Sequence, residues 1–333
     1  MKMKIVKKGL LTLLFPALMF LVMLAITASN DKCYINGQLI FLQPDMVRQV
    51  FINACMTVCV ALAIWLQLKN GRFDFSAGAN MILSAIVAGN VGLLTGSPWM
   101  AILSAVAVSV ALSLFTATMY VVGRIPIIIS TIGATLLYES LTYLVFGGNG
   151  VRAFYSTANL AVFGRLPGIF LPTGIAVMAF VLFVYFTTQG RKGKILSNNQ
   201  SAGVNIGIDE KKNIFVSYLY TGIILGMAAT IYVSQNTVTP QSGLATSGIM
   251  FSYIVPVFMG MFIGLASCDV VGIIIAAIGM EILNYGLNCL NLGAGGWQQI
   301  IMGVFVLGFY AFSGQLGNIQ ALLSRMKQKK ARA

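Results

Sequence analysis

The positive charge of this chain sorts to one side of a membrane once its apolar runs are counted. About ten runs are long and apolar enough to cross a bilayer, and an N-terminus in the cytoplasm puts 17 of the 21 Lys and Arg residues on the inner side. With one span more or fewer, the basic loops would fall on both sides of the membrane and the bias would be lost. The sequence therefore predicts an all-α, polytopic transmembrane helix bundle of about ten spans, with both termini cytoplasmic. The four basic residues that fall outside are Lys32, Arg48, Arg152 and Arg165.

Spans of about 20 residues take up about 200 positions and leave no room for a separate soluble domain. Residues 1–333 are expected to form one transmembrane domain with an inner loop at about 189–213 and a basic cytoplasmic tail at about 314–333. The eighth run is short for a span, at about 14 residues, and could be tilted, broken or re-entrant. The expected spans are Leu10–Ala28, Val50–Leu68, Phe75–Leu94, Trp99–Val122, Ile125–Phe146, Ile169–Thr188, Ile214–Ser234, Tyr253–Ala266, Val270–Leu290 and Trp297–Phe312.

Composition supports the same class of protein. Hydrophobic residues make up 58% of the chain and charged residues only 9%, against about 25% charged in soluble domains. A net charge of +13 could suggest nucleic acid, but the excess lies in inner loops and the tail, where the positive-inside rule and anionic lipids explain it. Nucleic-acid binding is therefore not expected.

Several kinds of catalytic chemistry lack their residues. The chain has no histidine, and its five cysteines show no CxxC spacing, so no metal site or disulfide framework is expected. No GxxxxGK[ST] phosphate loop occurs, so the chain is not expected to hydrolyse nucleotide by itself. We expect neither an enzyme nor a cofactor bound by this chain.

Polar residues inside the spans are few and costly to bury, which makes each a functional candidate. Glu139 and Glu281 could carry protons, or each could accept hydrogen bonds as a structural cross-link. Asn284 and Asn288 follow Glu281 at i+3 and i+7, so the three share one helical face. This stripe is a candidate lining for the path of a hydroxylated solute, and helix–helix hydrogen bonding is the alternative. Further outward, the stripe continues with Gln298 and Gln299.

The longest inner loop combines a basic cluster with apolar and small residues. Its stretch ILSNNQSAGVNIGIDEKKN is neither strongly charged nor low in complexity. One or two short helices that present an apolar face to a partner would explain it, with Ile206 and Ile208 exposed. A plain connector has no use for exposed isoleucines.

This loop resembles one in the permease subunits of bacterial ABC importers for ribose and similar sugars, A-I-G-G-N-x-x-A-A-x-x-S-G-I. Here Ile206 replaces the usual Ser, and Gly203 replaces the second Ala. The other matching positions are Asn199, Ala202, Gly207 and Ile208.

Further motifs of the same family follow in order between about residues 41 and 310. A segment similar to G-G-I-D-L-S-V-G keeps Asp74, Ser76 and Gly78, and Arg124 with Pro126 matches R-I-P. Near the C-terminal end, LNYGLN and WQQ resemble L-N-N-G-L-N and W-Q-Q. Two departures concern Glu281, where a small or apolar residue is usual, and the segment from Gly264 to Asp269 (GLASCD), where the family usually has a Gly-rich G-G-x-G-S.

The resemblance implies a passive translocation subunit in the bacterial inner membrane. Its implied partners are a P-loop ATPase that binds ATP-Mg, an extracytoplasmic solute-binding protein, and a second permease chain, identical or paralogous. The loop Ser197–Ile208 would contact the ATPase. The implied solute is a monosaccharide, with a nucleoside or a sugar-like signalling molecule as the alternative. Two other classes stay open: an ion-coupled transporter that uses Glu139 and Glu281, and a membrane scaffold.

Overall fold

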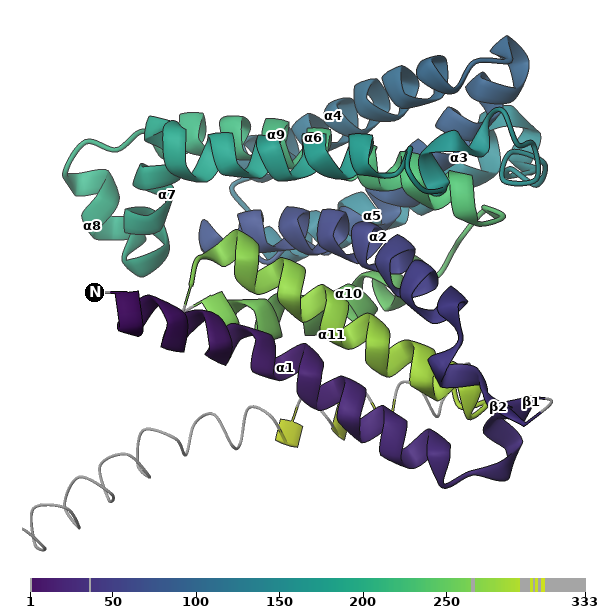
Figure 1. Cartoon of the computed structure of the whole chain (residues 1–333). Helices are drawn as coiled ribbons and strands as arrows, with labels where there is room; N and C mark the ends of the chain where they lie inside the picture. Colours follow the sequence, from purple (N-terminus) through teal and green to yellow (C-terminus); the bar gives the residue numbers. More distant parts are fainter. Residues whose placement is uncertain are drawn as a thin grey trace, which may run out of the picture.

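Long helices run back and forth across the molecule in the computed structural model (Figure 1). The structure describes residues 2–35, 37–264, 267–293, 300, 301, 303, 304, 307 and 308. The longer helices are α1 (Lys2–Ala28), α2 (Pro44–Lys69), α3 (Ala77–Thr95), α4 (Pro98–Gly123), α5 (Ile127–Leu144), α6 (Phe170–Val181), α9 (Glu210–Gln235), α10 (Ala245–Gly264) and α11 (Asp269–Cys289).

Short elements occupy the two ends of this bundle. At one end lie α7 (Thr188–Asn198) and α8 (Gln200–Asn205), and at the other a hairpin of β1 (Tyr34–Ile35) and β2 (Gln38–Leu39) (Figure 1). The start of α1 lies at the same end as α7 and α8. The remaining turns are η1 (Asp31–Cys33), η2 (Ile40–Leu42), η3 (Val145–Gly148), η4 (Ala161–Gly164) and the π-helical η5 (Leu182–Phe186).

The structure confirms the predicted fold class, an all-α bundle of membrane-spanning helices. Among the described residues, seven helices are long and apolar enough to cross a bilayer, and an eighth arises if α6 and η5 are joined to α7 across a 72° bend. The apolar part of α1, Thr12–Ala28, is shorter. The expected last span, Trp297–Phe312, lies for the most part outside the described residues. The number ten therefore stays a prediction.

The predicted first residue of the eighth span is wrong. We expected a run of about 14 residues from Tyr253, whereas α10 begins at Ala245 and has 20 residues, a full span. Its first turn, residues 245–248, consists of small and polar residues (ATSG), which contribute little to a hydropathy signal for a membrane helix. Pro256 lies inside α10, buried, and does not end it. Neighbouring helices that cover the freed carbonyl make such a proline tolerable in a membrane.

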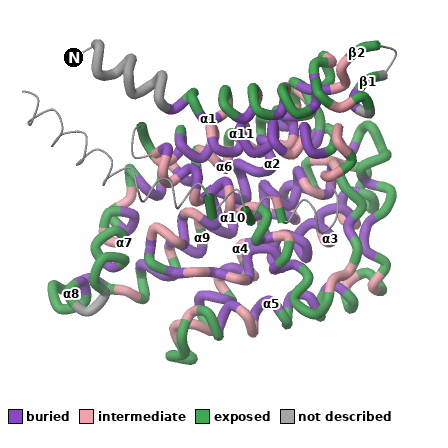
Figure 2. The backbone as a smooth tube through the Cα atoms, turned by 90° about the horizontal axis from the view of Figure 1, so that it is seen from below, coloured by how far each residue is buried: buried purple, intermediate pink, exposed green. Residues whose placement is uncertain are grey.

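Helix α9 forms the centre of the bundle. It packs against α2, α3, α4 and α6, and Figure 2 shows the buried residues gathered in the inner helices, with exposed ones along the outer helices. At Gly222 and Gly226 a Cβ atom would lie 2.6 Å from the Cα atoms of Val110 and Val106. Only glycine at these two positions lets α9 and α4 approach so closely.

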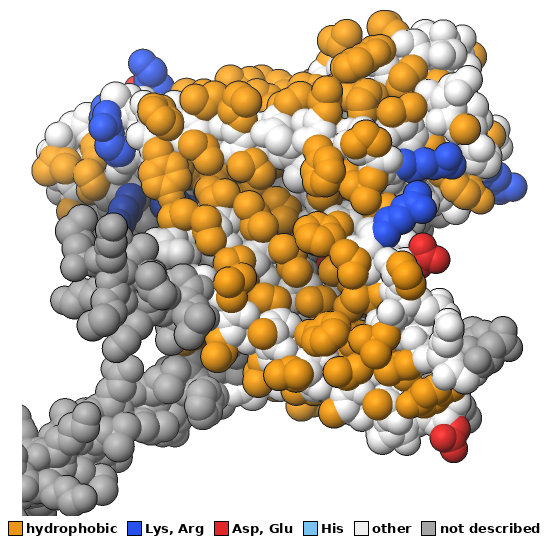
Figure 3. All heavy atoms as spheres, in the orientation of Figure 1, with side chains coloured by type: hydrophobic (Ala, Val, Ile, Leu, Met, Phe, Trp, Pro, Cys, Tyr) orange, Lys and Arg blue, Asp and Glu red, His pale blue; other side chains and the backbone are white. Residues whose placement is uncertain are grey.

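The outer surface of the bundle matches a lipid environment. Figure 3 shows hydrophobic side chains over the middle of one face, with Lys and Arg toward the two ends. Large apolar side chains such as Leu103 (64% exposed) and Leu144 (74% exposed) have no partner to bury them within the chain. A continuous apolar belt of this extent is the surface that a bilayer covers.

The start of α10 is held by a carboxylate from α5. Glu139 is only 1% exposed. Its Oε2 accepts a hydrogen bond from the backbone N–H of Leu244 (2.8 Å), and its Oε1 accepts from the N–H (2.8 Å) and hydroxyl (2.6 Å) of Thr246. The first N–H groups of a helix lack partners within the helix, so a carboxylate there is doubly favourable. Of the two roles considered for Glu139, these contacts fit the structural one, in which the carboxylate accepts hydrogen bonds that join two helices.

We predict that Glu139→Gln lowers the free energy of unfolding by about 1–3 kcal/mol, because the amide turns an N–H₂ group toward buried donors. Thermal unfolding of the detergent-purified chain measures this. The control is Ser140→Ala, at the exposed neighbour whose hydroxyl bonds only within α5. Equal melting temperatures for the two variants would contradict the assignment.

Candidate functional site

A polar cavity of about 920 Å³ lies among α2, α9, α10 and α11. Its volume falls in the range of sites that hold small organic molecules. Amide, hydroxyl and carboxyl groups from all four helices reach its wall, which is unusual at membrane depth because each such group is costly to bury. The polar lining residues are Asn53, Thr57, Tyr232, Gln235, Asn236, Ser252, Tyr253, Glu281, Asn284 and Asn288.

Glu281 joins two walls of this cavity. Its Oε1 accepts a hydrogen bond of 2.6 Å from the hydroxyl of Thr57 on α2. Asn53, one turn earlier on α2, and Asn284 on α11 also hydrogen-bond to the carboxyl group. Glu281 is 8% exposed and faces the cavity. It is therefore both a cross-link between α2 and α11 and a polar group that a bound molecule can reach.

The structure brings together three of the five residues predicted to line a solute path. Glu281, Asn284 and Asn288 line the same cavity from α11. The other two, Gln298 and Gln299, lie outside the described residues. Whether any of them contacts solute stays a prediction.

Sequence reasoning missed the polar groups on the opposite walls. Asn53 precedes Thr57 by one turn on an otherwise apolar stretch of α2, and this spacing is a signal that a search for buried polar pairs would find. Gln235 and Asn236 stand at the end of α9 and resemble an ordinary helix terminus. Only the packing of α9 against α2 turns them toward the cavity.

Two short helices form most of the long inner loop, as predicted. We call residues 188–209 the α7–α8 segment. Asn199 begins α8 by accepting a hydrogen bond from the Ala202 N–H (3.0 Å), and Gly203 is buried against Leu196 of α7. Gly207 has φ +85°, a backbone conformation that L-residues rarely adopt, so it lets the chain turn from α8 into α9.

The apolar face of the α7–α8 segment differs in one residue from the prediction. Ile206 is exposed (70%), as expected, together with Val204 and Ile195. Ile208 is 8% exposed and so is buried, which corrects the expectation that it faces water. The N–H of Ile208 bonds to the carbonyl of Gly203 (3.1 Å), and this bond folds the residue back under α8. The exposed apolar patch is therefore Ile195, Val204 and Ile206.

The motif residues Asp74, Ser76 and Gly78 position α3. Oδ1 of Asp74 accepts hydrogen bonds from the Ser76 N–H (2.8 Å) and hydroxyl (2.7 Å) just before the helix. Burial raises the pKa of the Asp74 carboxyl above its ordinary value, and the bonds from Ser76 oppose the rise. At Gly78 a Cβ would lie 2.3 Å from the carbonyl oxygen of Thr246, so glycine is needed where α3 meets α10.

The other motif pair, Arg124 and Pro126, forms the junction of α4 and α5. Arg124 ends α4 with φ +50°, and Pro126 precedes the first turn of α5. Both are exposed, and neither lines the cavity. They serve the turn between two spans.

A buried arginine links the spans to the α7–α8 segment, and the sequence reasoning did not single it out. Arg72 is 5% exposed. Its Nη2 donates to Asn213 (2.9 Å) and Ser217 (3.0 Å) of α9, and its Nε donates to Gln67 of α2 (3.3 Å). Asn213 in turn donates to the backbone carbonyl of Gln189 in α7 (2.7 Å). One guanidinium thus holds three elements together.

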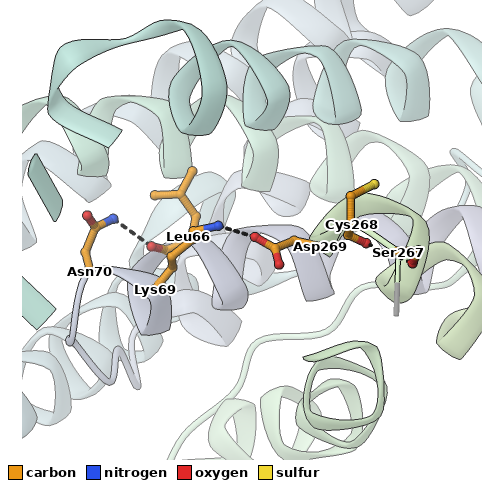
Figure 4. A network of polar contacts seen from close by, with 6 residues as sticks. All are labelled: Leu66, Lys69, Asn70, Ser267, Cys268 and Asp269. Atoms are coloured by element: carbon orange, nitrogen blue, oxygen red, sulfur yellow. Dashed lines mark hydrogen bonds and ion pairs between the residues drawn. The ribbon is translucent and has the colours of Figure 1, made fainter. Parts of the chain in front are cut away.

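A second contact between α2 and α11 lies at the end of the bundle nearest to α7. Lys69, the last residue of α2, forms an ion pair with Asp269, the first residue of α11 (Figure 4). The next residue, Asn70, donates to the carbonyl of Leu66 (2.7 Å). The ion pair stands in the segment that departs from the family pattern. Because the ion pair is partly exposed, it contributes little to the free energy of unfolding, but it fixes how the ends of α2 and α11 lie against each other.

A cavity with many polar side chains on its wall, set in a bundle of apolar helices, is typical of a membrane transport protein. The family described as "Branched-chain amino acid transport system / permease component" matches residues 46–310, most of the chain. The chain belongs to this family.

Individual relatives include import permeases for sugars. The ribose import permease of Escherichia coli K12 is 27% identical over 302 residues, covering 87% of this chain and 89% of the relative. The D-allose transport system permease of the same organism is 24% identical, covering 81% and 84%. An autoinducer 2 import system permease of Enterobacter sp. strain 638 is 25% identical, covering 84% and 83%.

We predict that Arg72→Met lowers the free energy of unfolding by about 2–5 kcal/mol, because buried acceptors on α2 and α9 lose their donor. The matched control is Arg124→Met, at an exposed arginine of the same end of the bundle. Thermal unfolding of the purified chain separates the two. Arg72→Met with the stability of the control would show that the network does not hold these elements together.

Proposed function

We propose that this chain is the membrane-spanning permease subunit of an ATP-driven ABC importer that carries a monosaccharide or a similar small, neutral polar solute. The observation that carries the proposal is the polar cavity within a member of this permease family. Amides both donate and accept hydrogen bonds, as sugar hydroxyls require. The relatives named for ribose and D-allose import support a monosaccharide, and the one named for autoinducer 2 import supports a sugar-like signalling molecule as the alternative, beside nucleosides.

The chain is a multi-pass protein of the inner membrane. The α7–α8 segment with Arg191, Lys192 and Lys194 belongs on the cytoplasmic side by the positive-inside rule. The start of α1 lies at that same end, which supports a cytoplasmic N-terminus (Figure 1). Ten spans with both termini inside complete the proposed topology.

Energy comes, in this proposal, from a P-loop ATPase that binds ATP-Mg and docks on the loop Ser197–Ile208. The exposed patch of Ile195, Val204 and Ile206 supports docking, since isolated apolar side chains at a cytoplasmic end have no lipid to cover them. Movement of the α7–α8 segment would reach α2 and α9 through Arg72. A second permease chain and an extracytoplasmic solute-binding protein complete the assembly, and no catalytic residue of this chain takes part.

The rival class is an ion-coupled transporter that works alone with Glu139 and Glu281. The contacts of Glu139 favour a structural role, because its carboxylate accepts three hydrogen bonds at the start of α10 and does not line the cavity. A membrane scaffold, the other rival, has no use for a cavity lined by amides.

The first prediction of this proposal concerns partners. Tagged chain purified gently from native membranes should bring with it a stoichiometric P-loop ATPase, identified by mass spectrometry. A chain that purifies alone and moves solute in ATP-free liposomes would overturn the importer proposal and favour the ion-coupled class.

The second prediction concerns Gly207. A valine at φ +85° costs about 1–3 kcal/mol of backbone strain, so Gly207→Val should distort the docking loop without unfolding the spans. Uptake by the reconstituted complex should fall roughly tenfold, as about 1.4 kcal/mol of strain on the docked state would produce, while ATP hydrolysis continues. The matched control is Gly96→Val, at a glycine with φ +65° and equally open space between α3 and α4. If Gly207→Val took up solute at the native rate, the proposal that the ATPase docks on the loop Ser197–Ile208 would be wrong.

A further inference from the structure

Among the described residues that line the cavity, Glu281 is the only one with an acidic or basic side chain. The only full charge that these residues can carry near pH 7 is therefore negative. No Lys or Arg occurs anywhere between Lys212 and Arg325, which excludes a basic residue from the body of α9 and from all of α10 and α11. On α2 no basic residue lies between Arg48 and Lys69. No Lys or Arg on the described part of these four helices therefore faces the cavity to balance the carboxylate.

The basic residues of α2 are paired or exposed. Lys69 is paired with Asp269, twelve residues along α2 from Thr57, or about 18 Å. Arg48 is exposed and precedes Asn53 by five residues. The other titratable groups on the wall, the hydroxyls of Tyr232 and Tyr253, are neutral near pH 7. The carboxylate thus sets the sign of the potential in the cavity.

Burial disfavours the ionised form of Glu281, and its hydrogen bonds oppose that effect. Thr57, Asn53 and Asn284 supply neutral donors, which stabilise the carboxylate without cancelling its charge by a countercharge. Inside a bundle of apolar helices the effective dielectric constant is far below that of water, so a unit charge acts strongly on a solute within reach. Rings or walls with one sign of charge select ions in channels by the same physics.

We propose that the cavity is a charge filter in which Glu281 is the specificity-determining residue. It admits neutral hydroxylated solutes and those that carry a protonated amine, and it rejects anionic ones such as sugar phosphates and sugar acids. This inference rests on the proposed function, because it names the class of solute that the importer passes. It also assigns a role to Glu281, which departs from the family pattern.

The test measures the sign of the potential directly on the purified chain. The five cysteines are replaced by serine, and Ser252→Cys places a reporter thiol on the α10 wall, where the native side chain is exposed to the cavity. The thiol is then treated with two methanethiosulfonates, one with a trimethylammonium group and one with a sulfonate group. Each forms a mixed disulfide and releases methanesulfinate. A neutral methyl reagent and a free thiol in solution correct for access and intrinsic reactivity.

With Glu281 present, the corrected rate for the cationic reagent should exceed that for the anionic reagent by roughly tenfold or more. Glu281→Gln should bring the ratio close to one, and Glu281→Asp should restore it. The matched control is Asp269→Asn, which removes a carboxylate at the far end of the same helix and should leave the ratio unchanged. Equal rates for both reagents in the chain that keeps Glu281 would overturn the proposal.

Gln235→Lys keeps the proposal testable if Glu281→Gln fails to give a single gel-filtration peak. An ammonium group on the α9 wall should lower or invert the ratio. A ratio that does not respond to it would also overturn the filter. These measurements need no ATPase, so the filter and the importer proposal can fail independently.

Discussion

The cavity depends on a single carboxylate that holds the start of α10. Glu139 reaches across from α5 to the N–H groups of Leu244 and Thr246, and Gly78 lets α3 lie directly against the carbonyl of Thr246. Water is scarce at this depth, so unpaired N–H groups must find partners within the protein. Because α10 forms one wall of the cavity, the shape of that wall is set from α3 and α5, which contribute no lining residue of their own.

The inner end of the bundle is organised by a different kind of contact. Around Arg72, polar side chains of α2 and α9 and the backbone of α7 share one hydrogen-bonded network. Gln67 extends it by donating to Thr221, further along α9 (2.8 Å). Directional contacts resist rotation more than apolar packing does, so the α7–α8 segment and the inner ends of the two spans form one rigid block.

The sequence was most informative about features that repeat over many residues. Hydropathy and charge predicted an all-helical membrane bundle, and the stripe of Glu281, Asn284 and Asn288 predicted one face of α11 that lines the cavity. The start of α10 was not predicted because its first turn is small and polar, and Glu139, which accepts hydrogen bonds from this turn, is more than 100 residues away in the sequence. The burial of Ile208 was not predicted either, since it depends on how the chain turns after α8, where the N–H of Ile208 bonds back to the carbonyl of Gly203. Contacts of this kind leave no periodic signal in the chain.

The two contacts between α2 and α11 have a mechanical consequence. Thr57 with Glu281, and Lys69 with Asp269, join the same two antiparallel helices at points twelve residues apart on each. The two contacts fix the register of α2 against α11, so the wall that these helices form is tied at two heights. The α10 wall contains Pro256, which removes one hydrogen bond from the middle of the helix and makes it the easier of the two walls to bend.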